Sequence, residues 1–269
     1  NKKLLTIIEG DIKEDNLGLK ESYIKNLLSS VDVVYHCAAS TKINSPLDEI
    51  REVNVEGTKN VLDLSSRIKR CGKLKKINYI STAFVCGDFG GIFKENDLDL
   101  SQKFNSSYDR SKFEAEIVAN NFRNKGLWID IFRPPIIVGD SRTGRTRNYK
   151  NIYQLIHLCR AEIFDELPLQ DFFTYLVPVD KLSENIYMIS QNTELANQNY
   201  HPFSNIPVSL EQIIKMSAKI LNFKMPKIVT YNNSFIAKLN PSQKKILKNL
   251  VFFINLKARF DCSNYSAYM

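Results

Sequence analysis

The first half of the chain alternates between short apolar runs and longer amphipathic segments. The apolar runs are rich in branched residues and predict buried β-strands at residues 4–8, 31–37, 77–81 and 128–133. The segments between them carry helix start and stop signals and predict helices at residues 20–29, 46–70 and 107–125. Apolar strands in alternation with helices indicate a parallel sheet covered on both faces. We therefore predict an α/β fold with a doubly wound parallel sheet, in which ligands bind at the carboxyl ends of the strands.

Beyond Pro135 the alternation becomes less regular. Helical patterns recur at residues 152–164, 181–190, 210–221 and 242–253, and shorter strand-like runs lie at residues 174–179, 200–203 and 227–231. We predict that residues 1–145 form a Rossmann-type core suited to binding a dinucleotide. Residues 146–269 would be a mixed region that completes the sheet and forms a smaller C-terminal lobe facing the substrate.

The glycine pattern departs from that of a complete dinucleotide-binding core. Such a core normally opens with a strand, a Gly-rich turn and a helix, because glycines let the backbone approach the pyrophosphate. No such turn precedes Gly10, and the cluster Gly87, Gly90 and Gly91 follows a later predicted strand. The chain also begins with Asn1 rather than Met. We therefore expect the first Gly-rich βαβ unit to be missing, which leaves the core N-terminally incomplete.

The chain of 269 residues carries a formal net charge of +8, which favours acidic partners. Such partners include cofactor phosphates, a carrier protein with a phosphopantetheine arm, nucleic acid and an anionic membrane. Basic residues gather at 67–76, 142–150 and 238–248, and a solvated helix face or loop explains each cluster equally well. No zinc-finger, RNA-binding or basic-zipper pattern accompanies them, so we expect no nucleic-acid partner.

Other features of the composition narrow the class of protein. The longest apolar runs, such as residues 250–254, are too short to cross a bilayer, although residues 238–256 offer an amphipathic surface to a carrier protein or a membrane. Membrane contact is not expected. The five cysteines form no CxxC pair, which favours reduced thiols in a cytoplasmic protein. The three histidines are widely separated, and we expect no metal site.

One pair of residues suggests acid–base chemistry. Of the twelve tyrosines, only Tyr108 is followed by a lysine four residues later, Lys112. On a helix these positions share a face, and an ammonium beside a phenol lowers the phenol pKa from its usual value near 10. The predicted strand before this helix ends at Ser81-Thr82, where a hydroxyl would face the ligand crevice. Thr82 would then stabilise an oxygen that becomes negative during the reaction.

Six short motifs follow one another along the chain. They are Gly10-Asp11-Ile12, HCAAS at 36–40, NVEGT at 54–58, ISTAFV at 80–85, Tyr108-x-x-x-Lys112 and RPPIIVG at 133–139. In this order they resemble the extended short-chain dehydrogenases/reductases. The segments LGL at 17–19, KFEAE at 112–116, GDSRTG at 139–144 and PVD at 178–180 resemble the thioester reductase branch of that superfamily. The branch includes terminal reductase domains of nonribosomal peptide and polyketide synthetases, carboxylic acid reductases and fatty acyl-CoA reductases.

The resemblance implies a role for each matching residue. Thr82 would be the active-site hydroxyl, Tyr108 the proton donor, and Lys112 the residue that holds the nicotinamide ribose and tunes the tyrosine. Asn54 matches a helix asparagine with a structural or proton-relay role. The resemblance implies three further groups of cofactor contacts. Asp11 and Ile12 match the positions that contact the adenine, and Ala38, Ala39 and Ser40 match the loop beside the ribose and phosphates. Pro134, Pro135 and Ile136 match the turn that packs against the nicotinamide. No basic residue for a 2′-phosphate can be matched, so NADPH in preference to NADH rests on the resemblance alone.

The resemblance also implies a reaction. NADPH would reduce an acyl or peptidyl thioester on a carrier protein and release the chain as an aldehyde or alcohol. A stand-alone fatty acyl-CoA reductase acting on a small-molecule acyl thioester is the nearest alternative. A nucleotide-sugar epimerase or dehydratase, and a non-catalytic nucleotide-binding module, are the alternatives from other classes.

Overall fold

The computed structural model describes residues 4–43, 45–192, 197–254 and 256–269. Its central element is a four-stranded sheet in the order β1-β2-β4-β9, and every neighbouring pair is parallel. The strands are β1 (Val33–His36), β2 (Lys76–Ile80), β4 (Ile129–Phe132) and β9 (Asn199–Tyr200). The predicted strands at 31–37, 77–81 and 128–133 thus correspond to β1, β2 and β4. The α/β fold with a parallel, Rossmann-type sheet is confirmed.

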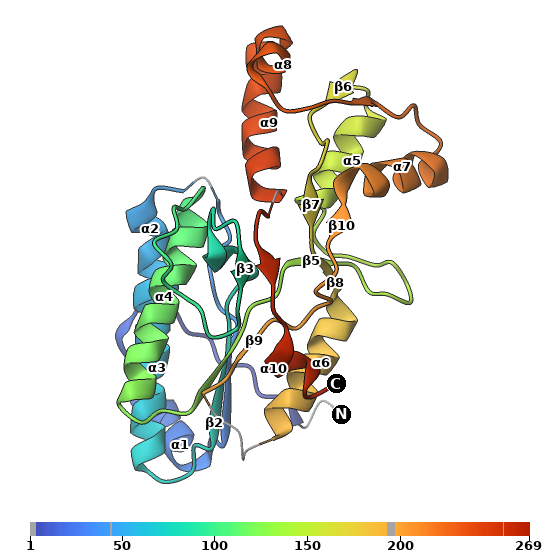
Figure 1. Cartoon of the computed structure of the whole chain (residues 1–269). Coiled ribbons are helices and arrows are strands. Elements are labelled where there is room, and N and C mark those ends of the chain that lie inside the picture. Colours follow the sequence, from blue (N-terminus) through green and yellow to red (C-terminus); the bar gives the residue numbers. More distant parts are fainter. Residues whose placement is uncertain (1–3, 44, 193–196, 255) are drawn as a thin grey trace.

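Helices cover both faces of this sheet (Figure 1). One face carries α1 (Glu21–Ser30), α3 (Gly57–Arg70) and α4 (Ser107–Asn124). Leu62 of α3 and Ala115 of α4 pack there against buried strand residues such as Ile77 and Ile129. The other face carries α6 (Val179–Gln191) and the short α10 (Ser263–Ser266). The residues of β4 and almost all of those of β2 are buried, which fits the predominance of apolar residues in these strands, whereas β1 at the sheet edge is less buried.

The long helix predicted at residues 46–70 contains an irregular turn. It consists of α2 (Leu47–Arg51), a π-helical turn η3 (Glu52–Glu56) and α3 (Gly57–Arg70), without a break in the chain direction. The extra residue of a π turn changes which side chains face inward. Asn54 lies in this turn and is 1% exposed. The amphipathic pattern predicts the helix but not the π turn, because an apolar period of about 3.6 residues does not reveal a single wider turn within the helix.

The strand predicted at residues 4–8 is wrong for the described structure. These residues form no strand, and the side chains of Leu4, Leu5 and Ile7 are 84%, 74% and 88% exposed. A strand requires a neighbour to complete its hydrogen bonds. Within the described residues β1 is the edge of the sheet and pairs only with β2. Residues 4–8 therefore have a strand-like composition without a strand partner.

A second lobe follows the sheet and lies above it in Figure 1. Its helices are α5 (Ile152–Arg160), α7 (Leu210–Leu221), α8 (Asn233–Lys238) and α9 (Pro241–Ile254). Four short strand pairs accompany them: β5 (Ile136–Val138) with β8 (Leu176–Pro178), β6 (Glu166–Leu167) with β11 (Lys227–Ile228), β7 (Phe173–Thr174) with β10 (Val208–Ser209), and β3 (Ile92–Phe93) with β12 (Arg259–Phe260). The strands predicted at 174–179, 200–203 and 227–231 are therefore shorter than expected, and the first is divided between two sheets. Among all the residues that the structure describes, no helix is both long enough and apolar enough to span a membrane.

The buried carboxylate of Glu95 ties the C-terminal segment to the core. It is 2% exposed and accepts hydrogen bonds from three backbone N–H groups, those of His201, Asn264 and Tyr265. The β3–β12 pair lies next to this contact in sequence. Chain segments about 170 residues apart are thereby joined at one polar centre.

Two buried histidines predict how stability depends on pH. Burial lowers the pKa of His36 and of His201 to about 3, because the charged ring is poorly solvated there. The unfolded chain takes up protons near pH 6.5 while the folded chain does not, so the free energy of unfolding falls as pH drops from about 6.5 towards about 3. We expect His201→Asn to flatten this dependence in denaturant unfolding between pH 6.5 and 4.5.

The exposed His157 provides the control for this measurement. His157→Gln removes an imidazole from α5 that is not buried, so the slope of stability against pH should match that of the wild type. An equal flattening in both variants would contradict the assignment of the slope to buried rings.

Candidate active site

A cavity of about 210 Å³ lies at the carboxyl end of β2, between the sheet and the second lobe. It brings together four of the predicted site residues, Thr82, Tyr108, Pro135 and Ile136. Its other walls are formed by Thr41, Ile43, Phe84, Ile137, Asn148, Lys150 and Asn151. Polar groups from the strand end therefore face an apolar wall and a basic loop across one small space.

Thr82 is positioned by the turn that follows β2. Its backbone is extended, and the short helix η4 (Ala83–Cys86) begins directly after it. The N–H of Phe84 donates to Thr82 Oγ1 over 3.3 Å, which fixes the hydroxyl at the strand end. The N–H of Ala83 donates to the carbonyl of Pro134 over 2.9 Å, so this turn and the Pro134-Pro135 turn are held together.

Tyr108 is positioned by the start of α4. The helix is capped by Ser106, whose hydroxyl accepts the N–H of Asp109 over 3.1 Å. This places Tyr108 in the first turn, where its side chain lines the same cavity as Thr82. The strand-end hydroxyl and the helix tyrosine thus border one space.

The protonation of Tyr108 differs from the expectation. Its pKa is raised to about 12, first by burial and then by the neighbouring Asp109, while the Thr82 hydrogen bond acts in the opposite direction. Lys112 does not contribute to this balance. The phenol therefore holds its proton throughout the neutral range, so Tyr108 has a proton to give and cannot accept one.

Lys112 instead reaches the sheet. Its ammonium donates to Tyr79 Oη over 2.7 Å and to the carbonyl of Ile80 over 2.9 Å, and it lies 4.3 Å from the Tyr79 ring centre. The side chain is 2% exposed, and burial lowers its pKa to about 7, with Glu116 and Cys37 opposing the shift. The i, i+4 spacing from Tyr108 correctly placed Lys112 on the inner face of α4, but Tyr79 is the partner that it binds.

Behind Tyr79 lie His36 and Thr58. Thr58 Oγ1 donates to the carbonyl of Asn54 over 2.7 Å, so its oxygen is left to accept from His36 Nε2 over 2.9 Å. The His36 ring in turn stacks on the ring of Tyr79, whose hydroxyl accepts from Lys112. Burial raises the pKa of Tyr79, which keeps its proton in place. These contacts hold Tyr79, and with it Lys112, at the strand end.

Asn54 holds the loop after β1. Its side-chain oxygen accepts the N–H of Ser40 over 2.7 Å, and its Nδ2 donates to the Ser40 carbonyl over 3.0 Å. The same Nδ2 group donates to Ser111 Oγ on α4 over 2.9 Å. The π turn is what presents Asn54 inward between the two segments. Its role in the described structure is to fix the position of Ser40 relative to α4.

The remaining predicted cofactor residues do not line the cavity. Ala38 and Ala39 lie in the loop between β1 and Asn54, and Ala38 is exposed. Asp11 is exposed, and its carboxylate accepts the N–H of Lys13. Ile12 packs against Gly57, where a Cβ atom would approach its side chain to 2.7 Å. Asp11 and Ile12 thus lie away from the cavity lining, whereas the loop with Ala38 and Ala39 leads into Thr41, which lines the cavity.

The residues around Lys112 fit the ribose of a nicotinamide dinucleotide. An ammonium has three N–H donors, and two of them are used by Tyr79 and Ile80 among the described residues. The third remains for a hydroxyl at the strand end. The small side chains of Ala38 and Ala39 leave the backbone of the neighbouring loop accessible to a ligand. These features suit the chemistry of a cofactor that carries a nicotinamide ribose.

Tyr79→Phe tests whether this tyrosine positions Lys112. The variant removes an acceptor from the ammonium, so we expect a further drop in the pKa of Lys112 and a rise in cofactor KM of roughly tenfold to a hundredfold. Activity that requires the charged lysine falls as pH rises through its pKa. The high-pH limb of the kcat/KM profile should therefore move to lower pH.

Tyr35→Phe is the matched control, because Tyr35 lies on β1 and its hydroxyl pairs with Ser190 at 2.5 Å. Both variants lose one tyrosine hydroxyl from the sheet, and only Tyr79 contacts Lys112. An unchanged pH profile in Tyr79→Phe would rule out the positioning role, whatever its effect on stability.

Several of these residues have no signal that stands out in the sequence. Tyr79 lies within an apolar strand, and His36 reads as a buried core histidine. Strand pairing places them side by side, since His36 is the register partner of Tyr79 and their rings stack at 5.3 Å. Asn148, Lys150 and Asn151 belong to a basic loop whose path cannot be read from its composition.

Comparison with known proteins places this geometry in a family. A family model described as Male sterility protein (NAD_binding_4) matches residues 1–186. A linear gramicidin synthase from Brevibacillus parabrevis is 28% identical over 199 residues, which cover 71% of this chain and 4% of that protein. The L-2-aminoadipate reductase from Candida glabrata is 26% identical, in its large subunit, over 203 residues, which cover 70% of this chain and 14% of that protein. The chain thus spans a small part of the length of these relatives.

Solved structures show the same fold. The terminal R domain from the myxalamid PKS-NRPS biosynthetic pathway superposes with a TM-score of 0.80 and 24% identity, covering 97% of this chain and 68% of that chain. UDP-glucuronic acid 4-epimerase from Bacillus cereus in complex with NAD gives a TM-score of 0.67 and 20% identity, covering 95% and 70%. At these identities the likeness concerns the fold alone.

Proposed function

Because the chain belongs to the NAD_binding_4 family, described as Male sterility protein, we propose that it reduces a carrier-bound acyl or peptidyl thioester with NADPH. The observation that supports this most is the Thr82–Tyr108 pair, which lines the cavity with Tyr108 protonated at neutral pH. A reduction requires a proton donor beside the oxygen of the substrate. The epimerase alternative has support from fold similarity only.

In the proposed reaction the bound cofactor supplies a hydride to the thioester carbonyl carbon. Thr82 and Tyr108 would hydrogen-bond the carbonyl oxygen as it becomes negative. Tyr108 then gives its proton to that oxygen, and the resulting hemithioacetal breaks its C–S bond to yield an aldehyde and a thiol. Lys112, held by Tyr79, would orient the nicotinamide ribose. A second round on the aldehyde would give an alcohol.

The finer features of the proposal rest on the relatives and on the chemistry of the chain. A carrier protein as partner follows from similarity to a gramicidin synthase and from the net charge of +8. NADPH in place of NADH follows from the resemblance to thioester reductases. A cytoplasmic location agrees with five free cysteines, Cys37 and Cys71 being exposed.

The test is an assay of NADPH oxidation with an acyl thioester as substrate. We expect stoichiometric release of a free thiol together with an aldehyde, and slower oxidation with NADH. Oxidation that requires a UDP-sugar, or conversion of that sugar without net NADPH consumption, would establish the epimerase alternative instead.

A further inference from the structure

A second and larger cavity, of about 740 Å³, adjoins the candidate active site. The two cavities share four lining residues, Ile137, Asn148, Lys150 and Asn151. The floor of the larger one is apolar and consists of Ile137 and Val138 of β5 with Val179 at the start of α6. A ligand in the larger cavity would therefore lie in line with the space beside Tyr108.

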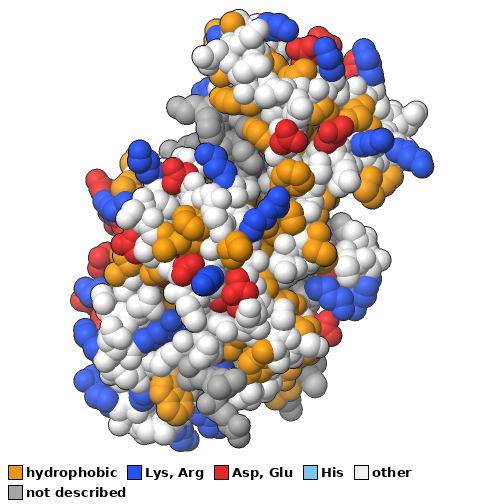
Figure 2. All heavy atoms as spheres, in the orientation of Figure 1, with side chains coloured by type: hydrophobic (Ala, Val, Ile, Leu, Met, Phe, Trp, Pro, Cys, Tyr) orange, Lys and Arg blue, Asp and Glu red, His pale blue; other side chains and the backbone are white. Residues whose placement is uncertain are grey.

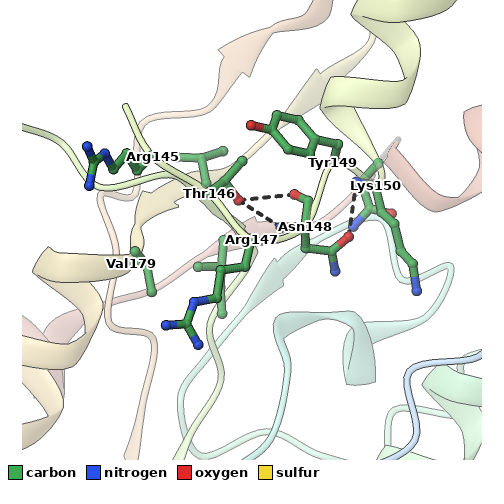
Figure 3. Close-up of a pocket in the computed structure, with 10 residues that line it drawn as sticks. Arg145, Thr146, Arg147, Asn148, Tyr149, Lys150 and Val179 are labelled. Carbon is green, nitrogen blue, oxygen red and sulfur yellow. Dashed lines mark hydrogen bonds between the residues drawn. The ribbon is translucent and has the colours of Figure 1, made fainter. Parts of the chain in front are cut away.

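The wall of this cavity is basic. Arg145, Arg147 and Lys150 line it, and no acidic residue belongs to the lining. Figure 3 shows the three side chains spread around the cavity, with Val179 between the two arginines. Figure 2 shows Lys and Arg side chains gathered at the right of the view, where the loop after β5 lies in Figure 1.

The loop that carries these cations is held in shape by its own polar contacts. The Asp140 carboxylate accepts the N–H groups of Arg142 and Thr143 over 3.0 and 2.9 Å, and the Asp180 carboxylate accepts the N–H of Ser141 over 2.7 Å. Further along, Thr146 and Lys150 are both hydrogen-bonded to Asn148 (Figure 3). These contacts hold the backbone of the loop on both sides of Arg145 and Arg147.

The carboxylates near this loop neutralise a different arginine. Arg142 pairs with Asp140 at 3.0 Å and lies 3.9 Å from Asp180. Within the described part of the chain, no ion pair is formed by Arg145, Arg147 or Lys150. Two guanidinium groups and an ammonium, none in an ion pair among the described residues, give this cavity the positive charge and the N–H donors that a phosphate requires.

We propose that Arg145, Arg147 and Lys150 bind the phosphate of a phosphopantetheine arm, with the pantetheine chain along the apolar floor and the thioester beside Tyr108. This inference rests on the proposed function, because it identifies the part of the substrate that lies away from the reacting carbonyl. The arm carries a phosphate at one end and the thioester sulfur at the other. A carrier protein and coenzyme A both supply this chemistry.

The first experiment compares three substrates with one acyl group: acyl-pantetheine, acyl-phosphopantetheine and acyl-coenzyme A. We expect kcat/KM to be roughly tenfold to a hundredfold higher for the two phosphorylated thioesters than for acyl-pantetheine. The advantage should shrink at high salt, because the cations are exposed. Equal kcat/KM for acyl-pantetheine and acyl-phosphopantetheine would overturn the inference and leave the proposed reduction in place.

The variant Arg145→Gln/Arg147→Gln tests the residues. The ratio of kcat/KM between acyl-phosphopantetheine and acyl-pantetheine should fall towards one. The matched control is Arg160→Gln/Lys215→Gln, which removes the same charge from exposed positions of α5 and α7 outside the cavity lining. The control should keep the wild-type ratio, and an equal fall in both double variants would indicate a general charge effect and overturn the site.

Direct binding separates this inference from the proposed reduction. Free 4′-phosphopantetheine should bind the full chain more tightly than pantetheine by calorimetry, and the Arg145→Gln/Arg147→Gln variant should lose the difference. This result with no thioester reduction would retain the phosphate site and reject the reaction. Reduction with no binding preference would reject the site and retain the reaction. With a carrier as donor, a larger advantage than with acyl-coenzyme A would assign the arm to a carrier protein.

Discussion

Tyr108→Phe is expected to lower kcat for thioester reduction by at least about a hundredfold, because it removes the group that gives a proton to the carbonyl oxygen. The raised pKa of Tyr108, about 12, keeps the phenol protonated over the whole assay range. Thr82 lines the same cavity as Tyr108. Loss of one hydroxyl leaves Thr82 as the remaining donor to the oxyanion, so substrate KM should change far less than kcat.

The control for this prediction is Tyr187→Phe on α6, where the ring is 61% exposed. Both variants remove one phenol hydroxyl, and only Tyr108 lines the cavity. Single-turnover measurements with saturating cofactor and thioester would separate chemistry from product release. A Tyr108→Phe rate within tenfold of the wild type, in a variant that melts normally, would show that another group supplies the proton.

The sheet could be predicted because its central strands, β2 and β4, are largely buried and rich in apolar residues. Continuous apolar runs and the helices between them leave few alternatives to a parallel sheet, and the predicted strands at 31–37, 77–81 and 128–133 contain most of β1, β2 and β4. The run at residues 4–8 has the same composition and forms no strand. The difference lies in the neighbours, because hydrogen-bond partners for a strand come from the tertiary structure and are not encoded in the run itself.

The sequence predicts where the residues of the candidate site lie in the fold, but not which groups each side chain contacts. A strand end followed by a helix start predicts that Thr82 and Tyr108 face the same crevice, and both line one cavity. The i, i+4 rule predicts that Lys112 shares a helix face with Tyr108, but it says nothing of the strand beneath. In a buried site the ammonium binds the acceptors within reach, and those are Tyr79 Oη and the Ile80 carbonyl. The prediction that Lys112 lowers the pKa of Tyr108 is therefore wrong.

The second prediction with a large effect concerns the stability of the fold and the face of α4 that carries Tyr108 and Lys112. Tyr108, Lys112 and Glu116 follow one another at four-residue spacing on α4. Glu116 and Arg133 are both 0% exposed, and the guanidinium binds the carboxylate through three contacts of 2.7 to 3.1 Å. Arg133 precedes the Pro134-Pro135 turn, and its Nη1 donates to the Glu95 carbonyl over 3.1 Å. This ion pair therefore joins the helix of the site to the strand end of the site.

Glu116→Ala should lower the free energy of unfolding by about 3 to 5 kcal/mol, because it leaves the Arg133 charge buried without a counterion. Glu184→Ala removes the carboxylate of an exposed pair, 3.0 Å from Lys181, and should cost less than about 1 kcal/mol. Adding Arg133→Met to Glu116→Ala should recover part of the loss, since the unpaired charge is then gone. Denaturant unfolding of the wild type, both single variants and the double variant completes the cycle, and additive losses from Glu116→Ala and Arg133→Met would contradict a direct pair.

Because Glu116 also raises the pKa of Lys112, Glu116→Gln should shift the high-pH limb of activity to lower pH. This carboxylate therefore links the stability of α4 to the charge at the candidate site.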